Sequence, residues 1–239
     1  MRPLQGALVP PRPTGVAAAA LVACALGACA TAPSSTGGGP APAVAADSAP
    51  ARPTAATASD AAPGLVPPGF GTLRQDDISL RLQRFGLQVR ATPLDESIIR
   101  LLSPDSYRAT SELKRSKAAE IAAVARRNGV RSPSLWYVSF FAVERGETRF
   151  SPMEFIITNV GRDFRPLDVI PLTPGFGEQR LRQNGRQDAL YVFDGQLDVQ
   201  QPLTVSYETS RNTDWASLLQ QIERERALVK SRAAAGRTP

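Results

Sequence analysis

The sequence predicts a single α+β domain built around an antiparallel β-sandwich, joined by a linker to an N-terminal export segment. Short stretches of alternating apolar and polar residues recur between residues 78 and 207, with turn residues between them. Two amphipathic helices, near 111–128 and 214–230, flank the strand-rich second half of the domain, residues 135–207. Strands and helices do not alternate regularly, so a doubly wound parallel sheet is disfavoured. Immunoglobulin-like topology is one candidate for the sandwich.

The first strand signal covers residues 78–82, where every second residue is apolar. The same pattern returns at residues 87–91, after Phe85-Gly86. These two stretches form either a hairpin or one long strand bent at Gly86.

Helical signals follow. Asp95 is placed to cap a short helix over residues 96–102, which Pro104 would end. A longer helix over 111–128 has Ser111 as its expected N-cap, and Asn128-Gly129 supplies a left-handed stop.

The second half reads mainly as strands. Residues 135–143 are apolar on both faces, as expected of a central strand that is covered on both sides. Residues 153–158 and 167–170 flank Asn159-Val160-Gly161, which is expected to form a tight turn.

Asn184-Gly185 is the strongest hairpin signal, and we expect it to join residues 178–182 to 188–193. A last alternating strand covers residues 203–207. In the C-terminal helix one side carries an apolar stripe that we expect to pack on the domain's own sheet: Trp215, Leu218, Leu219, Ile222 and Val229. Residues 223–226 are expected mostly on its solvated face.

Composition excludes several kinds of catalysis. The chain has no histidine, so Ser-His-Asp and Cys-His mechanisms and histidine zinc sites are not available. Both cysteines, Cys24 and Cys29, lie in the export segment, which leaves the domain without a thiolate nucleophile or metal ligand. We therefore expect a non-enzymatic protein without a cofactor or bound metal. Nucleic acid is not an expected partner, because no recognised motif is present.

Four groups of residues are weaker candidates for chemistry. Acidic pairs in expected turns can serve glycoside hydrolysis or calcium binding, although turn capping is the simpler explanation: Asp76-Asp77, Glu144 with Glu147, Asp163 with Asp168, and Asp194 with Asp198. Arginines in the second half can converge on an anion or can protect strand edges: Arg162, Arg165, Arg180 and Arg182. Gly175-Phe176-Gly177 is a weak phosphate-loop signal. Trp136-Tyr137 and Phe140-Phe141 can line a groove or fill the core.

The N-terminal segment carries the most specific signal. Residues 16–28 form an apolar run too short to be a permanent membrane span but suited to a secretory signal. The run closes with Leu26-Gly27-Ala28-Cys29, which resembles the lipobox of bacterial lipoproteins. The resemblance implies cleavage before Cys29 and attachment of fatty acyl groups to its thiol. Leu21-Val22-Ala23-Cys24 is a poorer second match because it leaves a shorter apolar core.

The sequence therefore divides into a signal peptide (1–28), a lipidated cysteine and linker (29–70), one β-rich domain (71–230) and a fraying tail (231–239). The linker is rich in Ala, Pro and Thr, which predicts disorder and a reach of roughly 35 Å. The expected location is the cell membrane or outer membrane, with the domain facing the periplasm or exterior. The expected role is binding or structural, toward an envelope protein or polymer. A carboxylate-dependent hydrolase of cell-wall glycans and a carrier of a small apolar or anionic ligand are the alternatives.

Overall fold

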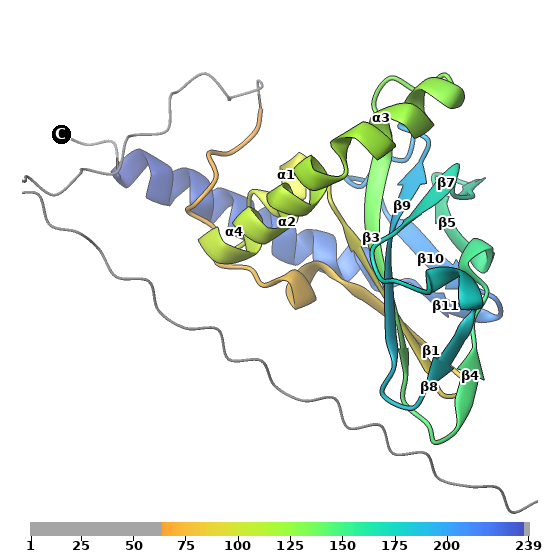
Figure 1. Cartoon of the computed structure of the whole chain (residues 1–239). Helices are drawn as coiled ribbons and strands as arrows, with labels where there is room; N and C mark the ends of the chain where they lie inside the picture. The colour runs from red at the N-terminus through yellow and green to blue at the C-terminus, as the bar shows by residue number, and fades with distance from the viewer. Residues whose placement is uncertain (1–63, 237–239) are drawn as a thin grey trace, which may run out of the picture. The chain divides into compact units, whose positions relative to one another are not determined.

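A computed structural model describes residues 64–236, which form two larger antiparallel sheets, a two-stranded ribbon and four α-helices (Figure 1). The larger sheet has the order β1-β2-β3-β9-β7. Its strands are β1 (Leu80–Arg84), β2 (Leu87–Pro93), β3 (Ser134–Ala142), β9 (Arg186–Phe193) and β7 (Asp168–Pro171). The α+β class and the central position of residues 135–143 are thus confirmed.

The smaller sheet has the order β11-β10-β5-β6. Its strands are β11 (Ser210–Asn212), β10 (Leu203–Tyr207), β5 (Phe155–Asn159) and β6 (Arg162–Phe164). A separate two-stranded ribbon pairs β4 (Glu147–Arg149) with β8 (Arg180–Arg182). In an immunoglobulin domain the second and third strands lie in different sheets. Here β1, β2 and β3 are neighbours in one sheet, so the strand order is a different one.

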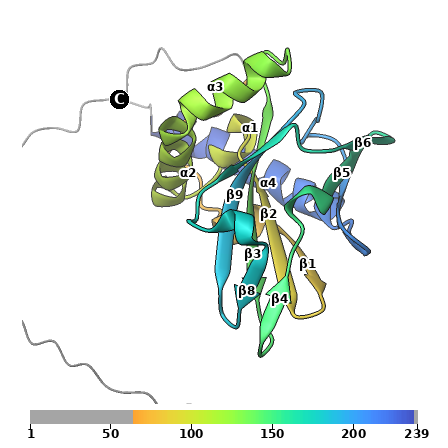
Figure 2. The ribbon, with the colours of Figure 1, turned by 45° about the vertical axis from the view of Figure 1, so that its right-hand side comes forward.

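The two sheets pack face to face (Figure 2). Aromatic side chains from both sheets lie between them, where they bury large areas and fill the core. Phe140 of β3 lies 5.6 Å from Tyr207 of β10, and Phe155 of β5 lies 5.3 Å from Tyr191 of β9, ring centre to ring centre. The hydroxyl groups of both tyrosines also form hydrogen bonds with the backbone between β4 and β5. The Tyr191 hydroxyl donates to the carbonyl of Pro152, and the Tyr207 hydroxyl accepts from the amide of Ser151.

The first helical region differs from the prediction in where its helices begin and end. Asp95 caps α1 (Glu96–Ile99), as expected, by accepting from the Ser97 amide at 2.8 Å. Pro104 does not end a helix but begins α2 (Pro104–Ser116), because proline suits the first helical position, where its missing N–H costs nothing.

The expected helix over 111–128 is two helices, α2 and α3 (Ala118–Arg127), separated at Lys117. Ser111 is therefore inside α2 rather than at its start. The hydroxyl of Ser116 donates to the carbonyl of Leu113, a bond that competes with the helical ladder at the break. The stop at Asn128-Gly129 is confirmed, with Gly129 at φ 67°.

The predicted Asn184-Gly185 hairpin was wrong. A turn does form there, but the strands on either side of it do not pair with each other. β8, before the turn, pairs with β4, and β9, after the turn, pairs with β3 and β7. Both turn residues instead hydrogen-bond to Ala142 at the end of β3. The tight turn expected at Asn159-Val160-Gly161 is confirmed, with positive φ at Val160 and Gly161. Val160-Gly161 joins β5 to β6, and β7 belongs to the other sheet.

The folded region begins earlier and ends later than expected. Val66, assigned to the linker, is buried, and helix α4 (Trp215–Ala235) continues beyond Ser231 with Ala233 buried. Trp215 packs on Trp136 at 6.0 Å between ring centres. Within residues 64–236, no helix combines the length and apolar character that crossing a membrane requires.

Of residues 223–226, which were expected mostly on the solvated face, Glu223 and Arg224 are exposed, whereas Arg226 is half-buried and Glu225 is buried. Glu225 is only 6% exposed. Its carboxylate accepts from the amide and hydroxyl of Thr72, both at 2.9 Å, and from Arg232 at 2.8 Å. Arg232 also donates to the carbonyl of Phe70, so α4 holds the first described residues in place.

Candidate functional site

The candidate site is a hollow on the outer face of the larger sheet, opposite the core. Strand register places Arg90, Ser139 and Asp188 in one row across β2, β3 and β9. The next row contains Gln88, Phe141 and Arg186. Because serine is the short side chain among long ones, a hollow of about 230 Å³ opens above it. We call it the Ser139 hollow, and its lining is Gln88, Arg90, Ser139, Phe141 and Arg186.

Arg186 is fixed by three neighbouring side chains. Its Nε donates to the Ser139 hydroxyl at 3.0 Å and to the Asp188 carboxylate at 2.9 Å. Its Nη2 donates to the Tyr137 hydroxyl at 2.6 Å. The guanidinium therefore has a defined position although its side chain is 52% exposed.

A second ion-pair group lies beside the hollow. Arg81 and Arg90 face each other across β1 and β2, a pairing of like charges that would destabilise the sheet on its own. Asp76 relieves the repulsion by binding both guanidinium groups, at 3.2 Å and 2.6 Å. Together, Arg81, Arg90 and Arg186 with Asp76 and Asp188 leave one positive charge in and beside the hollow.

The environment keeps Tyr137 and Arg186 in their ordinary protonation states at neutral pH. Burial, followed by the charge of Asp188, raises the pKa of Tyr137, so its hydroxyl remains protonated. The hydrogen bond with Asp188 is the largest of several causes that raise the pKa of Arg186. The arrangement offers charge, hydrogen bonds and an aromatic face for binding, and neither group is prepared for proton transfer near pH 7.

The acidic pairs proposed from the sequence are used in local structure. Asp76 binds arginines, while Asp77 accepts from the backbone amide of Arg74. Asp194 and Asp198 each accept from the amide two residues later, as turn-forming aspartates do.

The remaining carboxylates have different partners from one another. Asp163 accepts from the Thr158 hydroxyl, whereas Asp168 binds Arg127. Glu147 pairs with Arg180 at 3.6 Å, and Glu144 lies against Gly86. No cluster of three or more potential metal ligands occurs within residues 64–236.

The other candidates also separate. Phe176 of Gly175-Phe176-Gly177 is buried against Phe140 and Phe150, so this loop fills the core. Arg162 binds Gln196 and stacks on Phe164. Arg180 and Arg182 line a hollow of about 460 Å³ that also includes Arg186.

The aromatic pairs divide between the two faces of β3. Trp136 and Phe140 face the core, while Tyr137 and Phe141 are half-buried on the outer face. Strand alternation predicts that division, but neither Arg90 nor Arg186 was singled out from the sequence. Their convergence depends on the register among β2, β3 and β9, which the sequence pattern does not specify.

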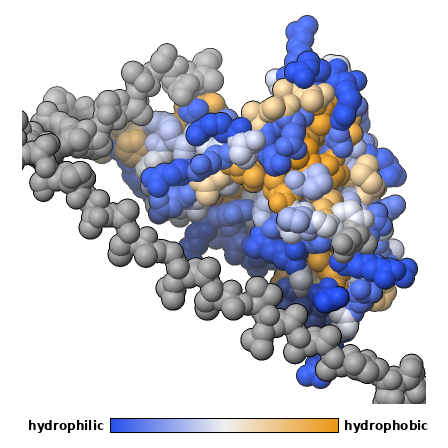
Figure 3. All heavy atoms as spheres, viewed as in Figure 1, coloured by the Kyte–Doolittle hydropathy of each residue, from blue (hydrophilic) through white to orange (hydrophobic). Residues whose placement is uncertain are grey.

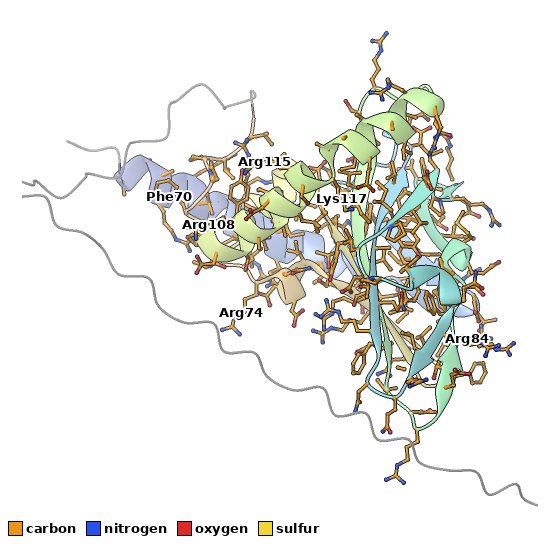
Figure 4. The ribbon with its side chains drawn as sticks, in the orientation of Figure 1. Phe70, Arg74, Arg84, Arg108, Arg115 and Lys117 are labelled. Atoms are coloured by element: carbon orange, nitrogen blue, oxygen red, sulfur yellow. The ribbon has the colours of Figure 1, made fainter. Side chains whose placement is uncertain are left out.

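Other parts of the described surface differ from the Ser139 hollow. A hollow of about 480 Å³ lies between residues 68–69 and α2, close to Arg108 and Arg115 (Figure 4). In the view of Figure 3, apolar side chains show most around α3 and the strands beside it, and the lower part of the domain is mainly polar. Cys29, the predicted lipidation site, lies outside the described residues.

Comparisons of the chain with protein-family models, curated proteins and solved structures found no match.

Proposed function

We propose that this protein is an exported lipoprotein whose β-rich domain is a non-enzymatic binding module of the bacterial cell envelope. The observation that carries the proposal is Leu26-Gly27-Ala28-Cys29 at the end of an apolar run of signal-peptide length. Cys29 is the lipidated residue in this proposal. One acyl chain holds a protein at a bilayer only marginally, whereas two or more hold it stably.

The fold supports an anchor at this end of the chain. The first described residues contact the last turns of α4, where Arg232 binds the Phe70 carbonyl. Figure 1 shows both segments extending away from the sheets on the same side. An anchor that pulls on residue 64 therefore acts on the clamp formed by Thr72, Glu225 and Arg232.

Lipidation can be tested by replacing each cysteine separately in the full chain, expressed in a bacterium that processes lipoproteins. We expect Cys29→Ala to abolish incorporation of labelled palmitate and to move the protein from the detergent phase to the aqueous phase. Cys24→Ala is the matched control and should keep both properties. Unchanged labelling of Cys29→Ala, or loss of labelling in Cys24→Ala alone, would refute the assignment of Cys29.

A further inference from the structure

We propose that the Ser139 hollow binds a carboxylate-bearing sugar unit of an anionic envelope glycan. This inference rests on the proposed function, because it names the class of partner for the anchored domain. It is carried by the fixed guanidinium of Arg186, the residual positive charge of the sheet face and the chemistry of the lining.

Arg186 is prepared to bind before any ligand arrives. A solvent-exposed arginine normally loses side-chain freedom when it binds, and this cost weakens the complex. Here Ser139, Asp188 and Tyr137 already hold the guanidinium. Among the described residues, no hydrogen bond involves Nη1 of Arg186. The N–H groups of Nη1 can therefore donate to a carboxylate in the plane of the guanidinium.

The charge of this face favours one carboxylate. Asp76 is shared by Arg81 and Arg90, and Asp188 pairs with Arg186. The group therefore keeps one positive charge, which a single carboxylate would neutralise. A neutral ligand can accept hydrogen bonds from these arginines but leaves that charge uncompensated.

The lining suits a sugar ring better than a peptide. Phe141 offers an aromatic face, while Gln88 and Ser139 offer an amide and a hydroxyl for ring hydroxyl groups. The exposed large apolar side chains of the described region all lie outside the hollow: Phe70, Phe85, Val143, Met153, Val160 and Leu228. An interface core for a protein partner is usually aromatic and apolar, and the hollow has only Phe141 to offer.

The edges of the larger sheet are also closed to a peptide strand. Ser210 and Asn212 donate side-chain hydrogen bonds to the carbonyls of Gln83 and Arg81 in β1. At the other edge, β7 has four residues and ends in Pro171, which has no amide to donate. Addition of a peptide strand, a common mode of peptide recognition, is therefore disfavoured at both edges.

A second hollow extends the site. Arg186 also lines the hollow of about 460 Å³ that contains Arg180 and Arg182. Glu147 lies there too and pairs with Arg180. Two adjoining hollows that share one arginine fit successive acidic units of a chain, so an oligomer should bind more tightly than a monomer.

The test uses ¹⁵N-labelled full-length protein and follows the arginine Nε–Hε signals by NMR. Galacturonate should shift the signals of Arg186 and Arg90 in a saturable manner, and galactose at the same concentration should not. Tetragalacturonate should bind at least tenfold more tightly than the monomer. Equal shifts with galactose, or no shifts with either acid, would overturn the proposal.

Variants locate the site. Arg186→Gln should weaken tetragalacturonate binding at least tenfold, and Arg186→Lys should also weaken it, because lysine keeps the charge but loses the planar fork. Arg211→Gln is the matched control, since Arg211 is an exposed arginine of β11 in the other sheet. Unchanged binding in both Arg186 variants would refute the site.

Competing ligands decide the class. If acetate or inorganic phosphate displaces galacturonate at equal concentration, the hollow binds adventitious anions only and the proposal fails. If tetraglutamate binds more tightly than tetragalacturonate, the partner is an acidic peptide and the proposal fails as well. Neither result bears on the proposed lipidation of Cys29, because palmitate labelling measures that lipidation independently.

Discussion

Glu225 holds the start of the folded region against the last turns of α4. Burial alone would raise the pKa of this carboxyl, but hydrogen bonds from Arg232 and Thr72 outweigh burial and lower the pKa below its usual 4.5. A buried carboxylate with three charge-assisted or backbone hydrogen bonds contributes to stability, and its loss leaves Arg232 and Thr72 with poorer partners.

Glu225→Gln should lower the free energy of unfolding by about 2 kcal/mol at pH 7, because the amide cannot replace the charged acceptor. Urea unfolding of the full chain measures this. Glu223→Gln is the matched control, since Glu223 is 55% exposed and pairs with Arg226 at 3.0 Å. That change should cost under about 0.5 kcal/mol. Equal effects of the two substitutions would contradict the clamp.

The same comparison has a defined pH dependence. Because the pKa of Glu225 is lowered on folding, its contribution is fully present above about pH 4.5 and declines as the pH falls below that value. The stability difference between wild type and Glu225→Gln should therefore shrink in acid. A difference that grows below pH 4.5 would show that the folded-state pKa is raised instead.

The residue-level pattern explains why Glu225 was predicted to be solvated. Residues 223–226 alternate in charge, which is typical of an exposed helix face. Glu225 is buried only because Thr72, distant in sequence, lies against that turn of α4. No local signal encodes such a contact.

Among the elements, two of the two-residue turns place a residue in a backbone conformation that its side chain disfavours. Phe85-Gly86 joins β1 to β2, and Val160-Gly161 joins β5 to β6. Phe85 and Val160 have φ of 36° and 50°, a left-handed region that strains large and β-branched residues. The glycine that follows each supplies the second positive φ such turns require.

Val160→Asn should raise the free energy of unfolding by about 1 kcal/mol, because asparagine tolerates this φ and Val160 is 72% exposed. Thermal or urea unfolding measures the gain. Val143→Asn is the control, as another exposed valine outside the positive-φ set, and should change stability by less than about 0.5 kcal/mol. A loss of stability in Val160→Asn would mean that the valine side chain has an important contact.

Local patterns predicted most of the elements but not their partners. Alternation placed β1, β2, β3, β9 and β10 close to their observed positions. The Asn184-Gly185 turn forms, yet the two strands on either side of it do not pair with each other. The strand before the turn, β8, pairs with β4 in a separate two-stranded ribbon. Likewise, a proline can end one helix or begin the next. The sequence analysis expected Pro104 to end a helix, whereas Pro104 begins α2.

At the scale of the whole molecule, the sandwich follows from its aromatic residues. β3 and β9 supply inward Trp136, Phe140, Tyr191 and Phe193, and the smaller sheet supplies Phe155 and Tyr207. Residues an even number of positions apart in a strand share a face, so Trp136 lies on the side of Phe140, and Tyr191 on the side of Phe193. The outer face is different, since its chemistry depends on register. Arg90 and Arg186 meet around Ser139 only because β2, β3 and β9 are aligned as they are.

The proposed lipoprotein would separate two tasks along the chain. The N-terminal segment would determine location, and the domain would determine what is bound. The clamp at Glu225 connects them, since it fixes the point where the linker enters the fold. The lipid on Cys29 is the claim on which the location and the role both depend.

Intact-mass and peptide mass spectrometry of the mature protein, extracted with detergent from bacterial membranes, tests that claim most directly. We expect the mature chain to begin at residue 29 and its N-terminal peptide to carry a diacylglyceryl group, with or without a third acyl chain. A mature chain that starts at another residue, or a Cys29 with an unmodified thiol, would contradict it.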